Sequence, residues 1–92
     1  MRRMRYRVTG RVQGVGFRAY AVRLARECGV VGWVRNDADG SVLAEAAGTD
    51  AALMSFAAGL RMGPPEARVE RLDASVLDDV DTVLMSDFEL ED

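Results

Sequence analysis

The feature that most constrains the fold is a change of hydrophobic period in the N-terminal third of the chain. Over residues 4–11 apolar and polar side chains alternate, which is typical of a strand with one buried face. Residues 12–16 interrupt the alternation with two glycines, and from Phe17 to Cys28 the apolar side chains recur at helical spacing. Gly29 is suited to end that helix. The sequence therefore predicts a strand, a glycine-containing loop and a helix in direct succession.

The rest of the chain continues with further strand and helix patterns. In chain order these predict a strand over residues 30–35, a hairpin loop over 36–40, a strand over 41–47, a helix capped by Thr49 and stopped at Gly63, a strand over 67–75, an acidic turn over 78–81 and a short last strand over 85–90. No internal linker or repeat divides the sequence, so residues 1–92 are expected to form one domain.

This order of elements predicts an α+β fold. Each helix has one apolar stripe and each strand one apolar face, so the elements can bury these surfaces in two layers. We expect a ferredoxin-like βαββαβ sandwich, with an antiparallel sheet, both helices on one face and a short extra edge strand. The other face of the sheet is expected to be open to water.

The composition excludes several kinds of chemistry. The chain has no histidine and no lysine, which excludes Ser-His and Cys-His nucleophile pairs, Schiff-base chemistry and the usual zinc sites. Cys28 is the single cysteine, so no internal disulfide can form, and among apolar neighbours it is expected to pack as a small hydrophobic residue. Catalysis by this chain would have to use arginine, asparagine, carboxylates, hydroxyls and backbone amides.

Charge is distributed unevenly along the sequence. Residues 1–35 carry nine arginines and one acidic residue, a net charge of +8, whereas residues 36–92 carry three arginines and fourteen acidic residues, a net charge of -11. The basic half of the chain favours an anionic partner, and the acidic half disfavours binding along an extended stretch of nucleic acid. The simpler alternative is that most of these charged side chains lie on outer faces in contact with water. No apolar stretch reaches the length of a membrane span, and we expect a soluble, cytoplasmic protein.

Residues 10–18 are the first segment that could carry chemistry. A strand that runs into a glycine-containing loop and then a helix directs successive backbone N–H groups into one concavity, which can bind phosphate oxygens. Arg18 is expected in the first turn of the helix, where its guanidinium could bind two oxygens of the same anion. From these residues alone, an ordinary tight turn beside an exposed arginine remains an alternative.

Residues 32–42 are the second such segment. Asn36 is the only asparagine in the chain, and its carboxamide, at the end of a predicted strand, could hold a water molecule through one acceptor and one donor. The alternative is that Asn36 only stabilises the hairpin turn. Trp33 is expected to pack in the core or at its rim.

Both segments resemble the sequence motifs of the acylphosphatase family. The matching stretches are residues 8–18, residues 32–36 with Gly40, Val42 and Gly48 at the family's spacing, and residues 63–69. The resemblance extends over essentially the whole chain. Gly16 stands where some members carry a bulkier residue, but glycine is also common there.

The resemblance implies a site and a reaction. It implies that loop amides and one arginine bind the substrate's phosphate, at Gln13, Gly14, Val15, Gly16, Phe17 and Arg18. It also implies that Asn36 positions the water that attacks phosphorus, so Arg18 and Asn36 are the expected catalytic residues. The implied enzyme hydrolyses small-molecule acyl phosphates to a carboxylate and inorganic phosphate without a metal or cofactor. We expect a monomer with no nucleic-acid or membrane partner.

Three other functions are compatible with the same fold. A non-enzymatic anion- or RNA-binding module is one, but the open face of the first strand offers arginines and no row of aromatic residues. An acylphosphatase-like domain that guides carbamoyl phosphate in a larger maturation enzyme is another, and the end of the sequence at Asp92 favours a free-standing enzyme instead. A regulatory domain that binds a small molecule would not need Arg18 and Asn36 together.

Overall fold

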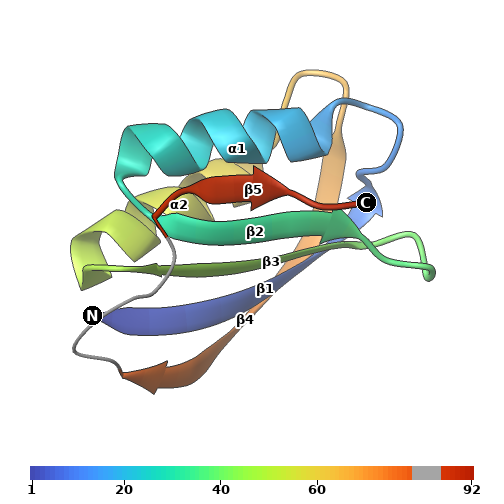
Figure 1. Ribbon diagram of the computed structural model, residues 1–92. Helices are drawn as coiled ribbons and strands as arrows, with labels where there is room; N and C mark the ends of the chain where they lie inside the picture. Colours follow the sequence, from blue (N-terminus) through green and yellow to red (C-terminus); the bar gives the residue numbers. More distant parts are fainter. Residues whose placement is uncertain (80–85) are drawn as a thin grey trace.

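The computed structural model describes residues 1–79 and 86–92 of the chain (Figure 1). Its elements are β1 (Arg2–Arg11), α1 (Phe17–Cys28), β2 (Val31–Asn36), β3 (Val42–Gly48), α2 (Asp50–Met62), β4 (Arg68–Asp79) and β5 (Phe88–Leu90). This order confirms the predicted ferredoxin-like α+β fold with a short additional strand. Neither helix in the described part of the chain is long and apolar enough to cross a membrane.

The five strands form one sheet in the order β4-β1-β3-β2-β5. The pairs β1–β3, β1–β4 and β2–β3 are antiparallel, but β5 pairs in parallel with β2. The sheet is therefore mixed, and the prediction of an antiparallel sheet was wrong for its last strand. The reason is topological: β4 ends at the same end of the sheet where β2 begins, so a strand that enters beside β2 from that end runs parallel to it.

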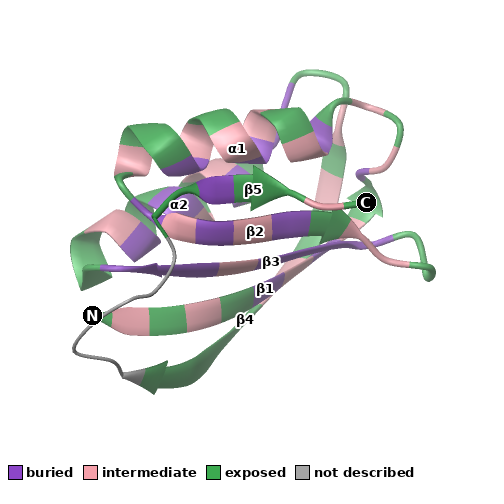
Figure 2. Ribbon diagram, viewed as in Figure 1, coloured by how far each residue is buried: buried purple, intermediate pink, exposed green. Residues whose placement is uncertain are grey.

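Both helices cover one face of the sheet and enclose the core (Figures 1 and 2). Tyr6 of β1 packs edge-on against Phe56 of α2 at a ring-centroid distance of 5.6 Å, and Phe56 packs against Phe88 of β5 at 5.5 Å. Tyr6 lies on an inner strand, Phe56 on a helix and Phe88 on the edge strand β5, and all three rings are almost completely buried. The aromatic contacts add to the free energy of apolar burial that holds the two layers together.

The helix ends lie where the sequence predicts them. Gly29 adopts a left-handed conformation after α1, and its N–H donates to the carbonyl of Ala25 at 2.9 Å. The Thr49 hydroxyl accepts a hydrogen bond from the N–H of Ala52 at the start of α2, and Gly63 follows its last residue. Cys28 is half-buried, and burial, together with the neighbouring Glu27, raises the pKa of its thiol. A raised thiol pKa is consistent with a packing role.

Two predictions near the C-terminus need correction. Asp78 and Asp79 were expected in a turn, but β4 continues through both. Asp78 lies opposite Arg3 of β1, and their side chains form an ion pair with a Nε–Oδ1 distance of 2.9 Å. This cross-strand pair favours strand pairing in a segment whose polar sequence alone is typical of a turn. The last strand begins at Phe88; Val80, Asp81 and Met85, which belonged to the predicted turn and strand, lie outside the described residues.

Candidate active site

A hollow of about 190 Å³ lies at the end of the sheet where β1 and β2 finish and α1 begins. It is lined by Val12, Gly14, Gly16, Phe17, Arg18, Ala19, Asn36 and Leu90. The hollow thus combines Arg18 and Asn36, the two residues expected to be catalytic. The connection from β1 to α1 contributes one wall, and the ends of β2 and β5 contribute the other.

The backbones of β1 and β4 approach each other closely at the point where the chain leaves β1 and enters this loop. The register between β1 and β4 shifts at Thr9 and Gly10. Gly10 has a φ of +125°, and a Cβ built there would lie 2.1 Å from the carbonyl oxygen of Arg68. Only glycine allows β4 to lie so close at this bulge. The bulge ends the regular strand just before the predicted phosphate-binding segment.

Two further glycines shape the loop itself. Gly14 and Gly16 have φ values of +73° and +77°, in the left-handed region, although a Cβ at either position would meet no heavy atom within 4 Å. Their role is therefore conformational. Gly16 is the N-cap of α1, and no side chain caps the helix start in the described structure. The first N–H groups of α1 accordingly remain available to an anion beside the hollow.

Arg18 projects from the first turn of α1 and contacts the C-terminal segment. Its Nη1 donates a hydrogen bond to the backbone carbonyl of Glu91 at 3.0 Å and lies 3.8 Å from the carboxylate of Asp92. The Arg18 side chain is 30% exposed, whereas that of Asp92 is fully exposed. Glu91 is separated from Arg18 by 73 positions in the sequence, so no local pattern could have indicated this contact.

Asn36 is the last residue of β2 and pairs with Val42 of β3. It is half-buried, and in the described part of the structure its carboxamide has no hydrogen-bond partner. The sequence predicted a loop residue at this position, whereas the structure places Asn36 within the strand ladder. Its backbone is therefore fixed while its side chain is available.

The remaining predicted phosphate-binding residues divide into two groups. Gly14, Gly16 and Phe17 line the hollow with Arg18, whereas Gln13 and Val15 do not. Val15 packs against the core. The Gln13 carboxamide instead reaches the hairpin, where its Nε2 donates to the carbonyls of Asp37 at 2.7 Å and Ser41 at 2.9 Å. The Gln13 side chain thus connects the loop before α1 to the hairpin that follows Asn36.

Arg7 and Ser41 form a second support for this hairpin, which the sequence analysis missed. Arg7 Nη1 donates to the hydroxyl of Ser41 at 2.9 Å, lies 3.5 Å from the carboxylate of Asp37 and also pairs with Asp39. Asp39 accepts hydrogen bonds from the Ser41 hydroxyl and amide. These bonds, with the charge of Arg7, lower the pKa of the Asp39 carboxyl. The alternating pattern of β1 places Arg7 on the open face of the sheet and so could have indicated that it has a cross-strand partner. The pattern could not have identified that partner.

The two carboxylates of the hairpin therefore form ion pairs with one arginine. Asp37 and Asp39 both face Arg7. Among the residues that the structure describes, no three histidine, cysteine, aspartate or glutamate side chains converge as metal ligands. The arrangement at the hollow is instead suited to an anion, because it combines helix N–H groups with a guanidinium.

Comparison with known proteins agrees with this geometry. The family model for acylphosphatase matches residues 4–90. An acylphosphatase from Salinibacter ruber is 50% identical to the chain over 87% of its length and 84% of that protein's. The crystal structure of an acylphosphatase from Bacillus subtilis matches with a TM-score of 0.92 at 33% identity, over 99% of both chains. A carbamoyltransferase, HypF2 of Cupriavidus necator, is 55% identical over 76% of this chain but only 9% of its own length. The chain belongs to the acylphosphatase family.

Proposed function

We propose that this protein hydrolyses the carboxyl-phosphate bond of acyl phosphates by attack of water on phosphorus. The products are a carboxylate and inorganic phosphate. The observation that carries the proposal is a hollow that brings together helix N–H groups, the Arg18 guanidinium and the Asn36 carboxamide, with no cap on the helix and no hydrogen-bond partner for the carboxamide among residues 1–79 and 86–92. Anion-binding groups and a water-binding group are the two parts that such a reaction needs.

The phosphate is bound by the loop over residues 13–17 and by Arg18. Left-handed glycines at positions 14 and 16 let successive N–H groups point to one side, and the α1 dipole adds positive potential. Arg18 uses Nη1 for the Glu91 carbonyl, which leaves N–H donors of its Nε and Nη2 for phosphoryl oxygens. The contact with Glu91 therefore orients the guanidinium and still leaves N–H donors for the phosphate.

Asn36 positions the attacking water. Its carboxamide oxygen can accept one hydrogen of the water and so direct the oxygen toward phosphorus. The bond from water oxygen to phosphorus forms as the bond from phosphorus to the carboxyl oxygen breaks, and the carboxylate leaves with that electron pair. Because a carboxylate is a good leaving group, no general acid is needed. The proton of the attacking water passes to an oxygen of the substrate's own phosphate.

Charge stabilisation comes from the protein without a metal ion. Arg18 and the loop amides offset the negative charge of the equatorial phosphoryl oxygens. Asp37 and Asp39, the acidic residues closest to Asn36 in sequence, are held by Arg7. We accordingly propose that the reaction needs neither metal nor organic cofactor.

We also propose a cytoplasmic monomer whose partners are small molecules. Arg18, Asn36 and the loop over residues 13–17 belong to one chain, so the proposed reaction does not require a residue from a second copy. An RNA-binding role is not favoured, because three arginines on the open face of β1 are already paired: Arg3 with Asp78, Arg5 with Glu45, and Arg7 with Asp37 and Asp39. Those carboxylates offset the positive charge that a nucleic acid would need.

Hydrolysis of acetyl phosphate in ¹⁸O-labelled water tests the proposal directly. The purified protein, assayed in excess EDTA, is expected to turn over acetyl phosphate and to place the label in inorganic phosphate. Arg18→Ala should abolish most of this activity, while Arg61→Ala, at the exposed end of α2, should retain it. Label in acetate would mean attack at carbon, and activity that disappears with EDTA would contradict the metal-free mechanism.

A further inference from the structure

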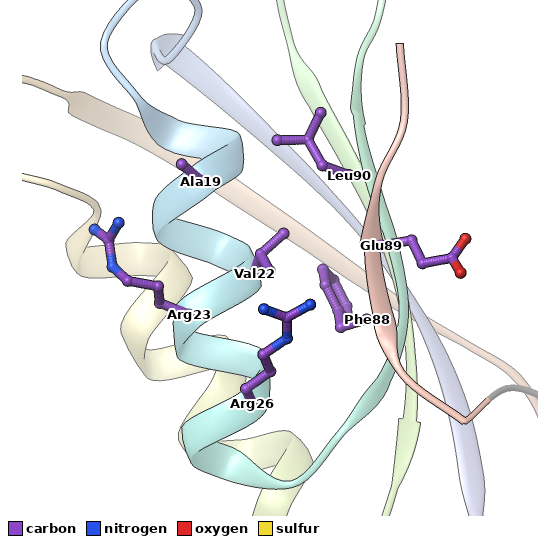
Figure 3. Close-up of a pocket in the computed structure, with 7 residues that line it drawn as sticks. All are labelled: Ala19, Val22, Arg23, Arg26, Phe88, Glu89 and Leu90. Carbon is purple, nitrogen blue, oxygen red and sulfur yellow. The ribbon is translucent and has the colours of Figure 1, made fainter.

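A second and larger hollow lies between α1 and β5, with a volume of about 550 Å³ (Figure 3). It has two residues in common with the proposed phosphate site, Ala19 and Leu90, which line both hollows. We call this second hollow the α1–β5 groove. Its position means that a substrate whose phosphate lies beside Arg18 can extend its acyl group directly into the groove.

The groove follows one side of α1. Arg18, Val22 and Arg26 are spaced four residues apart, so they occupy neighbouring positions on the helix surface. The eight-residue step from Arg18 to Arg26 corresponds to roughly 12 Å along the helix axis. A short acyl chain bound at one end by its phosphate therefore reaches the neighbourhood of Arg26 with its other end.

The walls of the groove change from apolar to basic along this path. Leu90 is 46% exposed beside the phosphate site, Val22 is half-buried, and Phe88 closes the floor. In Figure 3 the side chains of Val22 and Arg26 point from α1 toward β5, whereas Glu89 points away from the groove on the other side of β5. The groove thus offers apolar contact near the phosphate and positive charge farther along.

The positive end of the groove is partly compensated by one carboxylate. Arg26 binds Asp87 through Nε at 3.2 Å and Nη2 at 3.1 Å, and both side chains are more than half exposed. Nη1 of Arg26 remains available to a ligand. Arg23 also lines the groove, and its side chain has no ion-pair or hydrogen-bond partner among the residues that the structure describes. In Figure 3 the Arg23 side chain points away from β5, so Arg26 is the guanidinium directed toward β5 beside Asp87.

From these observations we propose that the α1–β5 groove is the acyl-group subsite. It favours acyl phosphates whose short apolar chain ends in a second carboxylate, with Arg26 as the residue that determines this preference. The inference rests on the proposed function, since it assigns the groove to the leaving group of that reaction. It concerns binding of the acyl chain and leaves the chemical step at phosphorus unchanged.

Two substrates of equal chain length isolate the charge preference. Adipoyl phosphate carries a terminal carboxylate where hexanoyl phosphate carries a methyl group. The quantity measured is the ratio of kcat/KM for adipoyl phosphate to kcat/KM for hexanoyl phosphate. Arg26→Gln should lower this ratio by about threefold, and Asp87→Asn should raise it by about the same factor, as expected for exposed charges. Arg61→Gln, on the exposed end of α2, should leave the ratio unchanged.

The two variants separate charge in the groove from loss of structure. Both break the same Arg26–Asp87 ion pair, so any effect of losing that pair on folding moves both in one direction. Opposite shifts of the ratio would support the subsite, while a common shift or no shift in both would overturn it. Acetyl phosphate hydrolysis by the unchanged protein tests the proposed function separately. If that activity is present and the ratio does not respond to either variant, only the inference about the groove fails.

Discussion

Replacing Gln13 by methionine removes the side-chain link between the phosphate loop and the hairpin after Asn36. Methionine keeps nearly the volume and length of glutamine but has no N–H donor, so both hydrogen bonds from Nε2 to the carbonyls of Asp37 and Ser41 are lost. We expect a protein that folds but is less stable, with a lower kcat. The substitution therefore measures what this link contributes.

The size of the effect follows from the bonds that remain. The carbonyl of Asp37 still accepts from the N–H of Gly40 at 3.1 Å, and the carbonyl of Ser41 still accepts from the N–H of Asp37 at 2.9 Å. Neither carbonyl is left without a partner, so the loss is that of two net hydrogen bonds, about 1–2 kcal/mol in the free energy of unfolding. For a domain of this size that corresponds to a fall in Tm of roughly 5–15 °C.

Thermal unfolding and steady-state kinetics check this reasoning together. Because Asn36 immediately precedes Asp37, a loosened hairpin should lower kcat by about tenfold, whereas inhibition by inorganic phosphate should change little. Gln13→Glu should be less stable than Gln13→Met, since it places a carboxylate against the same two carbonyls. If Gln13→Met unfolded at the original temperature with an unchanged kcat, the link would be irrelevant to both stability and catalysis.

Further predictions concern the two proposed catalytic residues and one core tyrosine. Arg18→Ala should lower kcat/KM by about 10²- to 10³-fold and weaken inhibition by inorganic phosphate, and Arg18→Lys should not restore activity because the planar fork is lost. Asn36→Ala should lower kcat by about 10²-fold with little change in KM; a large rise in KM at constant kcat would instead make Asn36 a substrate ligand. Burial raises the pKa of Tyr6 to about 12, so the neutral phenol favours the folded state. The stability that depends on it is complete below about pH 10 and is lost as the pH rises toward 12, a loss of about 2 kcal/mol. In urea titrations at pH 9 and pH 12, Tyr6→Phe should show a smaller difference than the unchanged protein; equal differences would contradict the assignment.

Local patterns in the sequence were sufficient for the order and most boundaries of the elements. The start of α1 at Phe17 and the N-cap at Thr49 depend on residues within one or two helical turns. A loop between β1 and α1 was predictable for the same reason, because its conformation depends on Gly14 and Gly16, whereas its binding of phosphate stays a prediction. These features are set by nearby residues, so the sequence around them contains the needed information.

The features that could not be predicted depend on pairing between distant segments. The parallel entry of β5 beside β2 follows from where β4 ends, and the contact of Arg18 with Glu91 follows from that entry. The sequence placed Gln13 in the phosphate loop but gave no sign that its side chain turns toward the hairpin. A carboxamide can bind any nearby carbonyl, so its partner is decided only when the strands are in register.

The uneven charge along the sequence has a structural explanation that bears on the site. Several of the N-terminal arginines pair with acidic residues from later strands and loops, as in Arg3–Asp78, Arg5–Glu45, Arg7–Asp39 and Arg26–Asp87. Arg18 differs from these four, because the carboxylate paired with it is 3.8 Å away on the fully exposed Asp92. An exposed carboxylate at that distance is screened by water and salt and holds a guanidinium only weakly. In the proposed function, the substrate's phosphate therefore takes the place of that carboxylate at Arg18 at little cost, whereas an anion at Arg3 or Arg5 would first have to displace a cross-strand carboxylate.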